Sequence, residues 1–239
     1  MKKENLKYYN QILPVQPFLI KNYKYVRKSY YRKLYKVLAD TQNLNNINKK
    51  YKLKSSKIVS INKMSSPPQS LNLLKTVTDL TKSKSVLEIG TFLGISAMAF
   101  ASVSKHVRVT TIEKFSEFYN IAKLNIKNNG LDKQINIING DAISVLKSLK
   151  KKFDLIFIDG NKENYLYYLK RVLKENTRKG SVIIIDNILF HGDVLNKAPV
   201  TAKGKGVKKV LEFIKKSKLF TSILLLPLYD GSLILKKKW

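Results

Sequence analysis

The sequence predicts an α/β protein with a Rossmann-like, doubly wound seven-stranded sheet that ends in an antiparallel hairpin and follows a basic helical N-terminal extension. Three observations support this prediction. From residue 63 onward, short apolar runs alternate with segments of helical periodicity. The apolar runs are almost continuous, which is typical of parallel strands covered on both faces. The last two runs are joined only by Tyr229-Asp230-Gly231, a connection that fits a hairpin.

Composition narrows the class of protein. A hydrophobic content of 44% over 239 residues is enough for the core of one α/β domain with an appendage. The absence of cysteine excludes disulfides, thiolate catalysis and zinc-thiolate sites, and fits a reducing cytoplasm. No apolar run approaches the ~20 residues of a membrane span, and polar residues interrupt the N-terminal stretch. We therefore expect a cytoplasmic protein that does not associate with membranes.

Residues 1–62 are predicted to form a basic, largely helical extension and linker, and residues 63–239 the main domain. A helix is expected after Pro17, with an apolar stripe of Leu19, Tyr23, Val26, Tyr30, Leu34 and Val37. Lysines and tyrosines on its opposite face could hold RNA phosphates and bases. We favour the alternative, a solvated face whose apolar stripe packs on the main domain or on the second subunit of a homodimer.

The net charge of +30 has two interpretations. Basic surface gains free energy beside a polyanion through counterion release, which favours a nucleic-acid partner. The abundance of Lys, Asn, Ile and Tyr is also what an AT-rich coding sequence imposes on every surface. Both contributions are expected, so charge alone does not define the function.

The elements of the main domain follow one another regularly. Pro67 and Pro68 prevent a helix before an apolar three-and-four pattern begins. Strands are predicted at 84–90, 107–113, 134–140, 153–159, 180–186, 221–228 and 232–237. Helices are predicted at 71–80, 95–104, 116–129, 143–150, 164–176 and 205–218.

The first strand leads into a glycine turn of the kind that binds a nucleotide-like cofactor. An apolar run ends at Gly90, and a helix of small residues begins after Gly94. The spacing Glu88-x-Gly90-x-x-x-Gly94 differs from the G-x-G-x-x-G fingerprint of dinucleotide-binding proteins. This looser turn, preceded by an acid, suits a cationic ligand without phosphates such as S-adenosylmethionine (SAM).

Polar residues at the next two strand ends could complete the cofactor site. Glu113 ends the second strand about twenty residues after Gly90, where an acid can bind both ribose hydroxyls. Gly140-Asp141-Ala142 ends the third strand and could lie beside a base. Asp141 could also cap the following helix, and the two roles are compatible.

The fourth and fifth strands end in a set of oxygen donors. Asp159 follows one apolar strand, and Asp186-Asn187 follow the next. Neighbouring strand ends would bring these side chains together as a set suited to Mg²⁺ or another divalent cation. Lys162 could instead supply the positive charge that two neighbouring carboxylates need.

From Met64 onward the sequence resembles the metal-dependent class I O-methyltransferases, which include catechol and caffeoyl-CoA O-methyltransferases and bacterial tRNA 5-hydroxyuridine methyltransferases. The resemblance rests on Leu87–Thr91 with Gly94 and Ser96, Thr111–Glu113, Gly140–Ala142, Phe153–Asp159 with Lys162 and Tyr165, and Asp186–Gly192. It implies that SAM is bound by Met64, Glu88, Gly90, Ser96, Glu113, Asp141, Ala142 and Asp159.

The same resemblance implies a catalytic set. Asp159, Asp186 and Asn187 would bind Mg²⁺ or another divalent cation, and Lys162 matches the family's general base. Lys162 could instead stay charged beside the acceptor oxygen, and we favour the base. Gly160 replaces the alanine that is commonest in the family, a change that should not disturb the metal.

The acceptor is the least determined feature. Lys197, Lys203 and Lys205 follow the fifth strand and could hold an anticodon stem-loop by its phosphates. We therefore expect methylation of 5-hydroxyuridine at the wobble position of tRNA. The alternatives are an O-methyltransferase for a catechol-like or caffeoyl-CoA-like molecule, and a non-catalytic basic RNA-binding protein. The RNA-binding alternative is disfavoured because the predicted metal ligands Asp159, Asp186 and Asn187 are all present. His191 is assigned no role.

Overall fold

The computed structural model describes residues 41, 51–56, 58, 65–227 and 230–239. These residues divide into two compact units, one up to Val145 and the other from Leu146 to the C-terminus. The predicted helix with its stripe from Leu19 to Val37, and Met64, lie outside the described residues. Within the part of the chain that the structure describes, no helix combines the length and apolarity needed to cross a bilayer.

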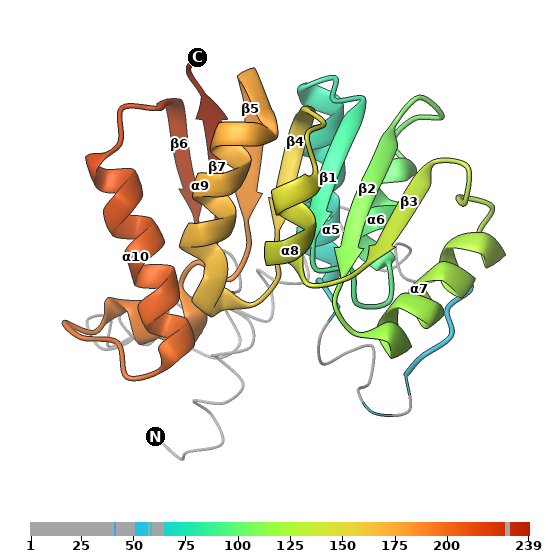
Figure 1. Cartoon of the computed structure of the whole chain (residues 1–239), viewed down its shortest axis with the longest axis horizontal. Coiled ribbons are helices and arrows are strands. Elements are labelled where there is room, and N and C mark those ends of the chain that lie inside the picture. Colours follow the sequence, from blue (N-terminus) through green and yellow to red (C-terminus); the bar gives the residue numbers. More distant parts are fainter. Residues whose placement is uncertain (1–40, 42–50, 57, 59–64, 228–229) are drawn as a thin grey trace. The chain divides into compact units, whose positions relative to one another are not determined.

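The first unit contains three parallel strands and the helices between them (Figure 1). Its elements are α5 (Pro68–Leu80), β1 (Ser85–Ile89), α6 (Ile95–Ala101), β2 (Arg108–Glu113), α7 (Ser116–Asn128) and β3 (Ile135–Asn139). β2 lies between β1 and β3 and is parallel to both, with Ile89 opposite Ile112 and Glu113 opposite Asn139. The carboxyl ends of all three strands therefore lie at one edge. The helix α8 (Ala142–Ser148) then carries the chain into the second unit.

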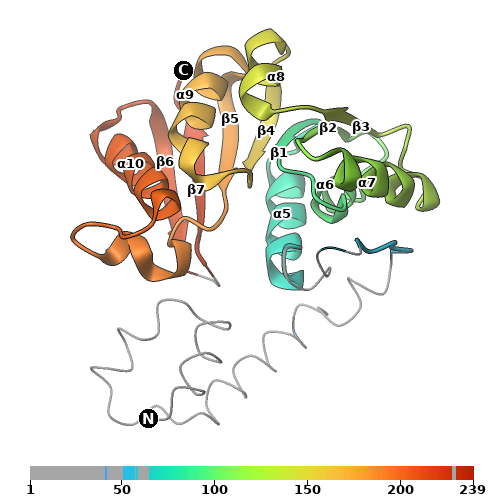
Figure 2. The same ribbon diagram turned by 60° about the horizontal axis from the view of Figure 1, so that its bottom comes forward.

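The second unit contains four strands in the order β4-β5-β7-β6 (Figure 2). Its elements are β4 (Phe153–Ile158), η3 (Lys162–Asn164), α9 (Tyr165–Glu175), β5 (Thr177–Ile185), η4 (Phe190–Leu195), α10 (Ala202–Lys216), β6 (Phe220–Leu226) and β7 (Ser232–Lys237). β4 and β5 are parallel, whereas β7 runs antiparallel to both β5 and β6. The predicted seven-stranded sheet with a C-terminal antiparallel pair is confirmed.

Strand β6 is unusual because it is apolar and yet exposed. Ile223, Leu224 and Leu225 are 52%, 51% and 39% exposed, respectively. Among the described strands, β6 pairs with β7 alone. Its other side therefore offers unpaired backbone N–H and C=O groups beside apolar side chains, the combination by which sheet edges associate.

Some helix boundaries differ from the predicted ones, and a local cap explains the start of α10. The helix predicted at 205–218 begins at Ala202, because the Thr201 hydroxyl accepts the Gly204 N–H at 2.9 Å as an N-cap. The helix predicted at 95–104 ends at Ala101. The predicted cap at Asp141 is confirmed, since its Oδ1 accepts the Ile143 N–H at 2.8 Å.

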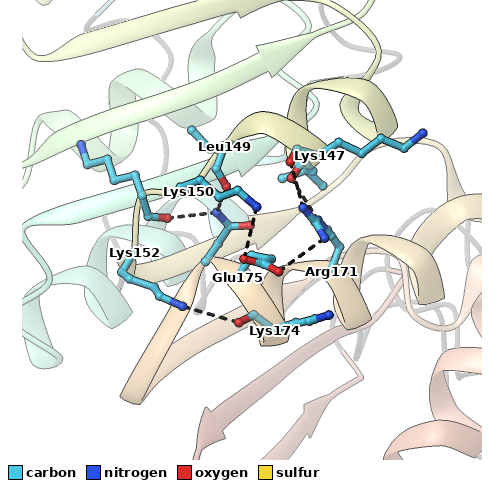
Figure 3. Close-up of polar contacts among 10 residues, drawn as sticks. Lys147, Leu149, Lys150, Lys152, Arg171, Lys174 and Glu175 are labelled. Atoms are coloured by element: carbon cyan, nitrogen blue, oxygen red, sulfur yellow. Dashed lines mark hydrogen bonds and ion pairs between the residues drawn. The ribbon is translucent and has the colours of Figure 1, made fainter.

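Hydrogen bonds fix the amino end of β4 to helix α9 (Figure 3). The Asn176 amide donates to the carbonyl oxygens of Leu149 and Lys151 at 2.8 and 3.0 Å. The Arg171 guanidinium donates to the carbonyls of Leu146 and Lys147 at 3.0 and 2.9 Å. These bonds satisfy backbone acceptors at the end of α8 and hold the start of β4. The predicted catalytic residues begin just after the carboxyl end of β4.

Candidate active site

Asp159 and Asp186 come together because the strands before them are in register. The last residues of β4 and β5, Ile158 and Ile185, are paired, and the Asp186 N–H donates to the Ile158 carbonyl at 3.1 Å. The carboxyl-terminal halves of both strands, residues 155–158 and 182–185, are buried and apolar, so Asp159 and Asp186 are the first polar side chains that follow them. The adjacency expected from the sequence is confirmed.

The negative charges of these two aspartates repel one another. Burial, together with the negative charge of Asp159, raises the pKa of Asp186 to about 7. The Ser232 hydroxyl donates to Asp186 Oδ1 at 2.9 Å and offsets part of this shift. A cation that lies between the two carboxylates stabilises a pair of this kind.

Among the described residues, Lys162 places a positive charge beside this pair of aspartates. Its Nζ lies 2.8 Å from Asp159 Oδ1, and the two side chains are 18% and 20% exposed. Burial alone would lower the pKa of Lys162, but the charge attraction and hydrogen bonds of Asp159 and Tyr165 together outweigh burial and raise it. Lys162 is therefore a charged ammonium in this arrangement, and its predicted role as base stays a prediction.

The donor set fits a divalent cation by its chemistry. Two carboxylates and one amide oxygen are the hard ligands that Mg²⁺ takes, alongside water and substrate oxygens. The single ammonium of Lys162 faces Asp159, while the nearby Asp186 has a raised pKa that a cation would lower. No group of three or more His, Asp or Glu side chains within the described ranges is arranged to hold a metal. The predicted metal ligands are the two carboxylates of Asp159 and Asp186 and the amide of Asn187, so they do not form a group of this kind.

Gly206, to which the sequence assigned no role, supports the position of Lys162. Helix α10 packs against η3, and a Cβ at Gly206 would lie 2.4 Å from the Lys162 carbonyl oxygen and 2.7 Å from Glu163 Cα. Both are backbone atoms, which cannot rotate away. The signal in the sequence was the pair Gly204 and Gly206 within an otherwise regular helix, where glycine is unfavourable.

We expect Gly206→Ala to destabilise the protein by about 1–2 kcal/mol and to lower kcat. Alanine favours the helix by about 1 kcal/mol, but overpacking against the η3 backbone costs more. The Lys162 backbone must then move away from its position beside Asp159. Urea unfolding and steady-state rates measure the two effects, with Lys215→Ala, at an exposed position of the same helix, as control. An unchanged unfolding midpoint and an unchanged kcat would contradict this expectation.

The residues predicted to bind the cofactor lie at the carboxyl ends of the first unit's strands. Glu88 in β1 is fully buried and accepts a hydrogen bond from the Thr111 hydroxyl of β2. The turn that follows needs glycine, since Gly90 and Gly94 have φ values of 100° and 86°. Ser96 lies in the first turn of α6 and is buried.

Glu113 holds the glycine turn through the backbone. Its Oε2 accepts the Phe92 N–H at 2.8 Å, and its Oε1 accepts the Phe115 N–H at 2.9 Å. Burial raises the pKa of Glu113, and these backbone hydrogen bonds oppose the rise. The sequence did not reveal this contact, because it depends on the conformation of the turn. The predicted ribose role adds to it and stays a prediction.

Asp141 and Ala142 complete this edge. Lys114, next to Glu113, pairs with Asp141 at 2.9 Å, and the Gly140 N–H donates to the Glu113 carbonyl at 2.8 Å. The hydrogen bond from Lys114, with that from Ile143, lowers the pKa of Asp141. The first unit thus brings together Glu88, Gly90, Ser96, Glu113, Asp141 and Ala142, and the second unit holds Asp159, Lys162, Asp186 and Asn187.

The chain belongs to the O-methyltransferase family, whose model matches residues 39–238. A catechol O-methyltransferase of Niastella koreensis is 31% identical over 147 residues, which are 59% of this chain and 66% of that protein. A caffeoyl-CoA O-methyltransferase of Stellaria longipes is 31% identical over 138 residues, 55% of this chain and 57% of that protein. The chain thus spans about three fifths of the length of these curated relatives.

A solved structure agrees with the family assignment. The O-methyltransferase from Bacillus cereus in complex with SAH aligns with a TM-score of 0.68 and 28% identity, over 74% of this chain and 84% of that chain. The resemblance to class I O-methyltransferases is confirmed at the level of family and fold.

Proposed function

We propose that this protein is a SAM-dependent, divalent-metal-dependent O-methyltransferase. The observation that carries the proposal is the pair of half-buried Asp159 and buried Asp186 beside Lys162, on a chain of the O-methyltransferase family. The SAH bound to the Bacillus cereus relative supports SAM as the methyl donor. Glu88, Gly90, Ser96, Glu113, Asp141 and Ala142 would hold it, with Met64 and Asp159 beside it.

Methyl transfer from a sulfonium is an in-line displacement, so the acceptor oxygen must be held close to the methyl group and lose its proton. Asp159, Asp186 and Asn187 would hold a divalent cation, which would supply Lewis-acid stabilisation of the deprotonated acceptor hydroxyl. Lys162 would take the proton of that hydroxyl at its Nζ only as the neutral amine, a form that a divalent cation held by Asp159 would favour. Its pairing with Asp159 supports the alternative in which Lys162 stays charged and stabilises the oxyanion.

For the acceptor we propose 5-hydroxyuridine at the wobble position of tRNA. Lys197, Lys203 and Lys205 are exposed in the segment that follows η4 and begins α10, the helix that packs on η3. Asp193 fixes this segment by accepting the N–H groups of Val200 and Thr201 at 2.9 and 3.0 Å. An ordered loop with several ammonium groups suits the phosphates of an RNA stem-loop.

The second candidate is a small catechol-like or caffeoyl-CoA-like acceptor. The named activities of the relatives from Niastella koreensis and Stellaria longipes favour it. It requires the same metal and cofactor residues but no role for the exposed lysines. The two candidates therefore differ in their dependence on those lysines and on salt.

The deciding experiment supplies methyl-labelled SAM and Mg²⁺ with tRNA that bears 5-hydroxyuridine, with catechol or with caffeoyl-CoA, each with and without chelator. Label in tRNA that disappears with chelator supports the proposal, and label only in the small acceptors overturns the tRNA assignment. Label that persists with chelator overturns the metal. For tRNA, the triple variant K197A/K203A/K205A should reduce the slope of log KM against log salt by about three. The matched control K105A/K127A/K133A, from exposed positions of the other unit, should leave that slope unchanged.

A further inference from the structure

The turn between β6 and β7 carries a buried carboxylate that the proposed reaction does not use. Asp230 is 9% exposed, and no pattern in the sequence connects it with the loop that carries Asn187. The Asp230 carbonyl accepts the Leu189 N–H at 2.9 Å, and the Gly231 carbonyl accepts the Ile188 N–H at 3.0 Å. Asp230 Oδ1 also accepts the His191 N–H.

These contacts hold a backbone conformation that the loop would not adopt alone. Asn187, Phe190 and His191 have φ values of 52°, 41° and 53°, in the left-handed region that side chains disfavour. Such residues persist only where the surrounding structure determines them. Here Asp230 and Gly231 supply that surrounding structure, and a Cβ at Gly231 would lie 2.7 Å from Leu189 Cγ.

The contacts of Asp230 and Gly231 act on Asn187 through the backbone of its loop. The N–H groups that they accept belong to Ile188, Leu189 and His191, which follow Asn187 in the chain. The next residue but one, Ser232, donates its hydroxyl to Asp186 Oδ1 at 2.9 Å. One short turn therefore contacts the Asp186 side chain through Ser232 and holds the loop that carries Asn187 through Asp230 and Gly231.

We propose that Asp230 and Ser232 are positioning residues for the metal site, with Asp230 holding the loop that carries Asn187 and Ser232 orienting the Asp186 carboxylate. The inference rests on the proposed metal-dependent function. Groups that orient metal ligands in this way typically change metal affinity by about 10–100-fold when they are removed.

The test is the affinity of the full-length protein for Mn²⁺, measured by calorimetry without acceptor. Asp230→Asn replaces the charged acceptor of the His191 N–H with a neutral amide and loosens the loop, so it should weaken Mn²⁺ binding by about 10–100-fold. Ser232→Ala should weaken it in the same direction by less. Asp154→Asn is the matched control, because Asp154 lies in β4 and pairs with Arg178, away from the strand's carboxyl end.

Thermal unfolding and SAM affinity separate positioning from a purely structural role. If Asp230→Asn lowers Tm but binds Mn²⁺ as the wild type does, the inference is overturned while the metal site stands. If the wild type binds no Mn²⁺, the proposed metal dependence fails, and the inference fails with it. If Asp230→Asn does not fold, Ser232→Ala decides, and an unchanged Mn²⁺ affinity in that variant overturns the inference.

Discussion

Replacing Asp159 with alanine is expected to reduce methyl transfer by roughly 10³-fold at saturating SAM and Mg²⁺. The variant loses one of two carboxylates that would hold the cation and the partner that fixes Lys162 at 2.8 Å. Polarisation by a bound metal contributes several kcal/mol, and each ~1.4 kcal/mol corresponds to about tenfold in rate. The measurement is the initial rate of label transfer from SAM over a range of Mg²⁺ concentrations.

The control for this variant is Asp154→Asn, a carboxylate of the same strand that pairs with Arg178 instead. It should retain the wild-type rate and its dependence on Mg²⁺. A rate in Asp159→Ala within about tenfold of the wild type would contradict the assignment of Asp159 as a metal ligand.

Replacing Glu113 with alanine is expected to raise the Kd for SAM by about 100-fold or more. The carboxylate accepts the backbone N–H groups of Phe92 and Phe115, and it would also bind the ribose hydroxyls. Hydrogen bonds to a charged group contribute about 1.5–3 kcal/mol each, so losing two of them accounts for a change of this size. Calorimetric titration with SAM and with SAH measures it.

Glu212→Ala, at an exposed position of α10, serves as the control for charge removal. Glu113→Gln separates the two contributions of the side chain, since it keeps the shape but loses the charge. SAM binding by Glu113→Ala with wild-type affinity would show that Glu113 has only a structural role.

The sequence predicted the parts of the fold that depend on local patterns. Continuous apolar runs predict buried parallel strands, and β4 and β5 end within one residue of the predicted ends. The adjacency of Asp159 and Asp186 followed from the same reasoning, since polar residues that end neighbouring strands must meet at one edge. Helix ends were less accurate, because single hydrogen bonds such as the Thr201 cap determine them.

Contacts between distant segments could not be predicted from such patterns. Asp230 was recognised only as part of a hairpin turn, although its carboxylate contacts the loop after β5. The approach of Gly206 to the Lys162 backbone depends on how α10 packs on η3. Both are consequences of packing, which no periodicity of apolar residues encodes. The predictions for the N-terminal helix and for Met64 concern residues outside the described ranges.

The exposed apolar edge of β6 has a practical consequence for work with this protein in solution. At low ionic strength, the net charge of +30 keeps molecules apart by mutual repulsion. Added salt screens this repulsion within about 8–10 Å at physiological concentrations but leaves the attraction between apolar edges intact. Colloidal stability should therefore fall as salt rises. Every salt titration of tRNA binding needs light scattering in parallel, so that lost affinity is distinguished from self-association.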